Sequence, residues 1–417
     1  MNRILQRLTP VVGLFFFTTI LSGCASYQSK VHQAREALSH RDYEKALKEL
    51  EPLAEKQSDD QLVYLLDYGT ALQIAGKYKE SNAVFMKADR LAERVDYQSV
   101  SRIAGSLALS EEMVQYKGDT FEKIFINAYL AMNFLEMGQL DDALVEARRI
   151  NEKYLKYRAD EKKKFELNSF SKYLSALIWE ASRSYDDAYI AYNEAYKIDP
   201  TIPTIHADLI RSAKLARRMD SYAQWKKQFP EVEEQESWYN RNLGELVIIY
   251  QQGWGPRKVP DRNEYRFPTL IAASSDTKKA RLTLLPEANT SYLSREVYDV
   301  EKAAIETLRE DQGILVAKRV AGIATKAVLS DQVRQQNQLL GDLAFIALNI
   351  ADRADVRQWS TLPQTIQIIR VPLKAGQYKF KIEGLDFTGS PTGENLENRE
   401  VLIKPGQKQF IVWRSLK

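Results

Sequence analysis

The chain has 417 residues, one cysteine, three histidines and a formal net charge of +3. A charge this close to zero excludes the strong positive field with which proteins attract nucleic acid, so nucleic acid is not an expected partner. One cysteine cannot form a disulfide within the chain, and the spacing of His32, His40 and His206 is not that of a metal site. We therefore expect no metal, no other cofactor and no catalytic residue.

Residues 1–23 have the composition of a secretory signal peptide. Arg3 and Arg7 precede a short apolar run at 11–21, and small residues lead up to Cys24. The motif Leu-Ser-Gly-Cys that ends at Cys24 resembles the lipobox of bacterial lipoproteins. This resemblance implies that the sulfur of Cys24 is acylated and that Cys24 becomes the new N-terminus. The alternative is an ordinary signal peptide that ends by chance at a cysteine.

The lipobox resemblance also implies a location. Lipoproteins kept at the inner membrane typically carry an aspartate pattern after the cysteine, whereas Ala25 stands here. We therefore expect a bacterial outer-membrane lipoprotein with palmitate and further acyl chains on Cys24, facing the periplasm. Residues 25–30 would form a tether with a reach of roughly 20 Å.

Residues 24–232 resemble tetratricopeptide repeats, in which small residues lie where the two helices of a repeat cross. In the clearest copy, Ala176 and Ala188 are these small residues, and Pro200 ends the second helix. The predicted copies span 65–90, 127–150 and 172–200, with weaker copies from about 31 and at 205–229.

The spacing of the repeats predicts two insertions. The bulky residue of the turn recurs at Tyr43, Tyr78, Leu140 and Tyr185, in steps of 35, 62 and 45 residues, whereas the usual step is about 34. The first insertion, between 91 and 121, is predicted to contain an extra helix at 99–114, and the second lies near 153–164.

A stack of such repeats leaves a concave groove, in which we expect a protein partner. The alternative is that the array only spaces the second half of the chain from the membrane.

Residues 237–417 predict a mixed α+β domain, so that the fold class of the whole chain is α+β. Its last part, about 360–417, is predicted to form a small sandwich-like β unit, with hairpin-like connections at 374–376 and 404–406. The predicted strands are 244–250, 280–285, 365–371, 377–382, 401–403 and 409–413, and the predicted helices are 298–309, 315–329 and 342–351.

A loop rich in glycine and proline follows the first of these strands. It places Trp254 beside Arg257 and Lys258, and an exposed aromatic next to two cations is a candidate partner-binding loop for a glycan, a peptide or a phosphate. The alternative is a tight turn with Trp254 in the core. The loop lacks the spacing and the following helix of a phosphate-binding glycine-rich motif.

The chain as a whole resembles an uncharacterised family of bacterial tetratricopeptide lipoproteins. The resemblance implies a role in envelope assembly, beside peptidoglycan, polysaccharide or secretion machinery. We therefore expect an interaction scaffold and not an enzyme. The alternative is an envelope glycan-binding or hydrolytic enzyme, which a deep pocket with two close carboxylates in the mixed domain would favour. The matching features are Cys24 and the segments 116–122, 143–149, 253–256, 355–359 and 362–363.

Overall fold

The computed structural model describes residues 27–106, 115–160, 164–263, 267–285, 290–312, 331 and 354–417. The predicted signal peptide with Cys24 and the predicted helices at 315–329 and 342–351 lie outside these residues. Within the described residues, no helix combines the length and the apolar character needed to cross a membrane.

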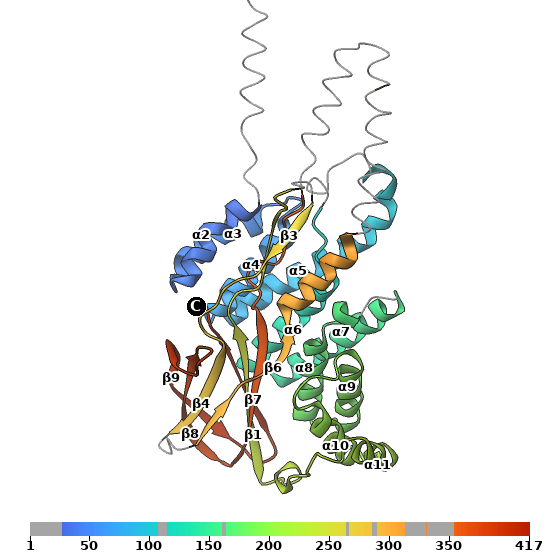
Figure 1. The fold of residues 1–417 in the computed structure, drawn as a ribbon, viewed down its shortest axis with the longest axis vertical. Coiled ribbons are helices and arrows are strands. Elements are labelled where there is room, and N and C mark those ends of the chain that lie inside the picture. The colour runs from blue at the N-terminus through green and yellow to red at the C-terminus, as the bar shows by residue number, and fades with distance from the viewer. Residues whose placement is uncertain are drawn as a thin grey trace, which may run out of the picture.

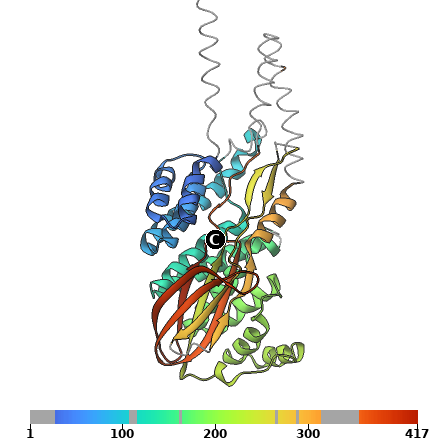
Figure 2. The same ribbon diagram turned by 60° about the vertical axis from the view of Figure 1, so that its left-hand side comes forward.

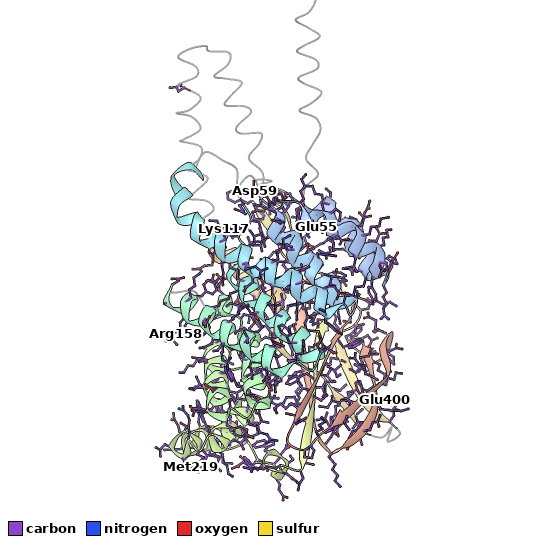
Figure 3. All side chains as sticks on the ribbon, turned by 180° about the vertical axis from the view of Figure 1, so that it is seen from behind. Glu55, Asp59, Lys117, Arg158, Met219 and Glu400 are labelled. Atoms are coloured by element: carbon purple, nitrogen blue, oxygen red, sulfur yellow. The ribbon has the colours of Figure 1, made fainter. Side chains whose placement is uncertain are left out.

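The first half is an array of antiparallel helix pairs in which each helix packs against the next. The array curves from α2 and α3 at one end to α10 and α11 at the other (Figure 1). Seen from behind, it runs from Glu55 and Asp59 down to Met219 (Figure 3). Its helices are α2 (Tyr27–Ser39), α3 (Tyr43–Glu55), α4 (Gln61–Ile74), α5 (Tyr78–Ser106), α6 (Thr120–Glu136), α7 (Leu140–Ala159), α8 (Ser169–Ala181), α9 (Tyr185–Ile198), α10 (Ile205–Leu215) and α11 (Met219–Gln228), with a short 3-10 turn η2 (Lys164–Leu167) before α8.

The turn inside each pair has the same backbone conformation. The turn that follows the first helix contains one residue with a positive φ, between 58° and 75°, which ends the helix in the left-handed region. The five turn residues are Arg41, Gly76, Gly138, Arg183 and Arg217. Their first three steps along the chain, 35, 62 and 45 residues, repeat those expected from the sequence, so the tetratricopeptide-like pairing is confirmed by the helices themselves.

The structure corrects two predicted details of this half. The first insertion is not a separate helix, because α5 continues without a break from Tyr78 to Ser106; residues 107–114 lie outside the description. The tether is shorter than residues 25–30, since α2 already begins at Tyr27.

The described residues of the second half form two four-stranded sheets and a two-stranded ribbon. The first sheet has the order β10-β1-β7-β6, with β10 parallel to β1, and the second has the order β5-β4-β8-β9. The ribbon pairs β2 with β3, and a 3-10 turn η3 (Glu236–Trp238) leads into β1. The strands are β1 (Leu243–Gln252), β2 (Arg257–Pro260), β3 (Pro268–Ile271), β4 (Lys279–Leu285), β5 (Ser291–Leu293), β6 (Arg295–Asp299), β7 (Thr365–Lys374), β8 (Gly376–Leu385), β9 (Pro391–Ile403) and β10 (Lys408–Arg414).

The first sheet is the middle of three layers. Successive side chains of a strand point to opposite faces, and β1 is apolar on both: Leu246 and Ile248 pack against the second sheet, while Val247 and Ile249 join the core of the helices. The array therefore lies on one side of this sheet and the second sheet on the other (Figure 2). Residues 365–369 of β7 are all buried, so this strand too is covered on both faces.

The connections at 374–376 and 404–406 are not hairpins. The first leads from β7 in one sheet to β8 in the other, and the second leads back from β9 to β10. As a result the sandwich predicted for 360–417 also takes strands from 243–299. The predicted helix at 298–309 is observed over 300–312, directly after β6.

Candidate functional site

The loop at 253–258 does not expose its aromatic side chain. Trp254 is only 9% exposed, and its Nε1 donates a hydrogen bond of 2.9 Å to the carbonyl oxygen of Leu416. Gly253 has a φ of +59°, and a Cβ there would lie 2.1 Å from the Oγ of Ser275, so only glycine fits this tight turn. Trp254 therefore lies in the core, as the alternative interpretation of this loop predicted.

The two cations of this loop lie in different surroundings. Arg257 is exposed, whereas Lys258 lies in β2 with its Nζ 3.4 Å from a carboxylate oxygen of Asp119. Trp254 instead lies beside two other cations. The guanidinium carbons of Arg35 and Arg414 are 4.9 and 5.6 Å from its ring centre. The expectation of an exposed aromatic next to two cations is therefore wrong.

The concave face of the array is occupied by an extended part of the same chain. Residues 354–364, called here the inserted segment, form neither helix nor strand and are almost entirely buried. Trp359 is 1% exposed and packs against Phe85, Phe125 and Tyr129, while its Nε1 donates to the Oγ1 of Thr70 at 2.8 Å. Irregular segments normally run over the surface, because their backbone groups need water or another partner.

Side chains of the array supply those backbone partners. Trp359 N donates to Glu122 Oε1 at 2.8 Å, and Thr361 N donates to Asp67 Oδ1 at 3.0 Å. In the other direction, Gln358 O accepts from the hydroxyl of Tyr27 at 2.8 Å. The array thus holds this segment in part through backbone groups that every peptide possesses.

Both accepting carboxylates have raised pKa values. Burial raises the pKa of Asp67 to about 6, although hydrogen bonds from Tyr27 and Thr361 and the charge of Arg35 oppose the shift. Burial also raises the pKa of Glu122 to about 7, and the nearby Asp119 adds to the effect. The inserted segment is therefore bound at carboxylates that gain a proton near neutral pH.

Four of the segments that carry the family resemblance meet here. Glu122 belongs to 116–122 and accepts from Trp359, whereas Gly255 N donates to Leu362 O at 2.8 Å. Between these segments only about 20 Å³ of open space remains, roughly the room for one water. This junction is a packed joint and not a ligand pocket.

A larger opening lies where the array meets the end of the sheets. It measures about 240 Å³ and is called here the arginine cleft. Arg399 in it lies 2.8 Å from Glu136, and Arg41 lies 3.4 Å from Glu394. The residues of the cleft used below are Arg41, Tyr43, Tyr78, Arg399, Trp413 and Arg414.

A second opening, the polar cleft, measures about 510 Å³ and lies beside β6 and β7. Burial and the neighbouring Asp299 raise the pKa of both Glu296 and Glu301. Its charged residues are Lys278, Lys279, Arg295, Glu296, Asp299 and Glu301. A pocket lined by neighbouring carboxylates in the mixed half is the feature that the enzyme alternative requires.

Among the residues that the structure describes, no group of three His, Asp or Glu side chains is placed to hold a metal ion.

Sequence reasoning missed Asp67 and Arg414 as partners of the inserted segment, and Arg399 as a residue of the arginine cleft. Asp67 and Arg414 act over sequence separations of 294 and 53 residues, and no local pattern marks them. The one sequence feature that pointed to this region was the motif at 355–359. It contributes to the family resemblance, but the sequence assigns it no structural role.

No protein-family model matches the chain, and no curated protein matches it. Solved structures with a similar path include "MamA RS-1 ArsTM double mutant", at 17% identity over 48% of this chain and 89% of that chain, with a TM-score of 0.32. "MamA 41-end from Desulfovibrio magneticus RS-1" shows 17% identity over 48% and 88%, with a TM-score of 0.30. "MamA AMB-1 P212121" shows 12% identity over 49% and 89%, with a TM-score of 0.31. Similarity this weak supports no conclusion, so the description of the fold rests on the helices and sheets themselves.

Proposed function

We propose that this protein is a lipid-anchored scaffold of the bacterial outer membrane, which binds proteins of envelope assembly or secretion on its helical array. The observation that carries the proposal is the inserted segment. The array binds it through its backbone, with Glu122 and Asp67 accepting from two of its N–H groups. Backbone recognition of an extended segment is a general mode of peptide binding.

The anchor rests on the sequence, and the fold is compatible with it. Tyr27, the first described residue, opens α2 only three positions after Cys24. Lipid on Cys24 would hold the α2 end of the array at the membrane and turn the rest towards the periplasm. Several acyl chains on one residue bind a membrane far better than a single chain.

Site-specific crosslinking in the native envelope tests the scaffold. A photoreactive phenylalanine replaces Tyr43 or Tyr78 at the arginine cleft, and, as a control, exposed Lys87 on α5. We expect a defined protein adduct from the cleft positions and none from the control. Absence of any protein adduct from the array, together with glycan release by the purified mature chain, would overturn the scaffold.

The substitution Cys24→Ser tests the anchor. We expect the variant to stay unprocessed or to leave the membrane fraction, because no thiol remains for acylation. Membrane retention of a cleaved Cys24→Ser variant would refute the lipoprotein assignment, while the crosslinking result would stand by itself.

The polar cleft supports a second candidate, an envelope glycan-binding or hydrolytic enzyme. Glu296 and Glu301 have raised pKa values beside Asp299, as a general acid requires. Incubation of the mature chain with purified cell-wall glycan, followed by analysis of released sugars, tests this candidate. Release that is lost in Glu296→Gln or Glu301→Gln would favour it, and no release from any preparation would refute hydrolysis.

A further inference from the structure

We propose that the arginine cleft binds an acidic segment of a partner protein, whose carboxylates pair with Arg414, Arg399 and Arg41. The proposal rests on the proposed scaffold function and deepens it by naming the chemistry of the partner. Three observations carry it: the cleft continues from the inserted segment, its cations outnumber their carboxylates, and its walls are aromatic.

The cleft is the open continuation of the face that already holds a peptide. Arg414 lies in the cleft, and its Nη2 donates to the carbonyl oxygen of Thr361 in the inserted segment at 3.0 Å. Tyr43 and Tyr78, each the first residue of the second helix of a pair, belong to the array side of the cleft. A volume of about 240 Å³ equals that of about eight waters, which accommodates an acidic side chain and its backbone.

Arg414 is a half-buried cation for which the described residues provide no salt bridge. Its hydrogen-bond partners are two neutral oxygens, Thr361 O at 3.0 Å and Gln251 Oε1 at 3.5 Å, and its Nε has no partner in the described part of the chain. Burial lowers the pKa of Arg414 to about 10. An incoming carboxylate would relieve this cost, because a charge-assisted bond to a guanidinium is among the strong hydrogen bonds of proteins.

A second arginine behind the cleft is in a similar state. Arg35 lies against the same Trp254 ring as Arg414, and its Nη1 has no hydrogen-bond partner among the described residues. Burial lowers the pKa of Arg35 also, while Tyr27 and Asp67 oppose the shift. Like Arg414, Arg35 therefore has a guanidinium nitrogen that has no partner among the described residues.

The two carboxylates near the cleft also accept hydrogen bonds from the backbone, so they do not serve its cations alone. Glu136 accepts from Arg399 with one oxygen and from the backbone N–H of Val412 with the other. Glu394 is fully buried and accepts from Leu416 N at 2.8 Å, while Arg41 reaches it only at 3.4 Å. With a side chain that is 44% exposed, Arg41 is free to turn towards a ligand at little cost.

The position of the cleft favours a protein over a lipid headgroup. Arg41 follows α2, and Tyr27 begins it, so the cleft lies beyond the far end of a helix of 13 residues, about 20 Å from the proposed anchor. Tyr43, Tyr78 and Trp413 offer aromatic surface for the apolar stems that flank acidic side chains in a peptide.

Fluorescence anisotropy with the full mature chain in detergent tests the proposal. The probes are a labelled octapeptide of alternating Glu and Ala, and the same peptide with Gln in place of Glu. We expect the Glu peptide to bind at least tenfold more tightly, and Arg414→Gln or Arg399→Gln to abolish that difference. Arg90→Gln, on the exposed face of α5, is the matched control and should leave binding unchanged. Equal affinity for the two peptides overturns the proposal.

Two further arms keep the result interpretable. Arg41→Gln removes a partly exposed cation at the cleft, so it should fold even where Arg414→Gln does not, and it should weaken the Glu peptide about threefold or more. The Cys24→Ser variant, which carries no lipid of its own, is also tested for binding to phosphatidylglycerol vesicles. Vesicle binding that the Glu peptide does not compete for, and that is lost when Arg41→Gln is added, would assign the cleft to lipid phosphate and overturn the proposal. Protein adducts at Tyr43 or Tyr78 together with equal peptide affinities would leave the scaffold standing and refute only the acidic partner.

Discussion

The interface between the helical array and the first sheet has two ends that treat charge in opposite ways. At the end near α8 and α10, three cations meet three carboxylates in a balanced ionic network. Arg370 Nη1 lies 2.7 Å from Asp208, and Arg370 Nε lies 2.7 Å from Glu245. The members of the network are Glu180, Asp208, Arg211, Glu245, Arg370 and Lys408.

At the end near α2, charges are buried or half-buried without direct counter-ions. Asp67 and Glu122 accept hydrogen bonds from the inserted segment, and Arg35 and Arg414 lie against Trp254. Among the described residues, these four side chains form no salt bridge that is shorter than 4.0 Å. At the end near α8 and α10, the pairing of opposite charges fixes the interface. The end near α2 instead leaves charges for which a partner can compete.

The pKa values of the carboxylates reflect this contrast. Burial alone would raise the pKa of Glu245, but Arg370 and Lys408 outweigh it and hold that pKa well below its usual range. For Glu122, burial prevails and raises the pKa to about 7. The difference teaches that the pKa of a carboxylate removed from water depends on how closely cations pair with it, because Arg370 and Lys408 bond directly to Glu245 whereas Lys258 only partly offsets the burial of Glu122.

The largest expected effect comes from removal of Trp359. Trp359→Ala deletes a fully buried aromatic side chain from the joint between array and inserted segment, and we expect a loss of about 4 kcal/mol in the free energy of unfolding. Chemical denaturation of the mature chain measures it. Phe387→Ala, at a side chain that is 88% exposed, is the control and should change stability by less than about 0.5 kcal/mol. A Trp359→Ala loss below about 1 kcal/mol would show that the segment is not held as described.

Breaking the ionic network should cost somewhat less. Arg370→Met keeps the length of the side chain but leaves Asp208 and Glu245 without their shared cation, so we expect a loss of about 3 kcal/mol in the free energy of unfolding. Arg281→Met is the control, because its ion pair with Glu383 is partly exposed and should contribute about 1 kcal/mol or less. Similar losses in the two variants would argue against a special role of the network.

The smallest effect concerns pH. The pKa of Glu122 rises from 4.5 to about 7 in the folded state, so between these values the folded chain retains a proton that the unfolded chain has released. The free energy of unfolding contributed by this group therefore falls as pH rises through that window. Thermal unfolding from pH 4.5 to 7.5 should show a flatter profile in Glu122→Gln than in the wild-type chain.

Glu245→Gln sharpens the same comparison. The lowered pKa of Glu245 contributes stability that is present above pH 4.5 and is lost as pH falls further, so this variant should alter the profile only on the acid side. Identical slopes of wild type and Glu122→Gln between pH 4.5 and 7 would contradict the assignment of the raised pKa to that carboxylate.

Local pattern predicted the local parts of this fold. The turns at Gly76 and Gly138 and the strand β1 follow from glycine position and from apolar runs, which act over a few residues. The separate helix predicted from residue 99 was wrong, because residues 99–106 continue α5, and the shift in repeat spacing does not say how an insertion is built.

The candidate site lay beyond such patterns. Trp359 forms a hydrogen bond to Thr70 across 289 residues of sequence. The sequence around Trp359 is that of an ordinary segment before a strand. Trp254 was singled out for its glycine- and proline-rich surroundings, which serve the turn and not exposure. Single-sequence patterns carry no information on which distant segment fills a groove.

The hydrogen bonds of Tyr27 have a mechanical consequence. Its hydroxyl donates to the inserted segment at Gln358 and contacts Asp67 of α4, and only Ala25 and Ser26 separate it from Cys24. Two residues span less than about 10 Å and cannot act as a slack linker. If Cys24 carries the proposed lipid, a pulling force on it would load this joint directly, because Tyr27 ties α2 to both α4 and the inserted segment.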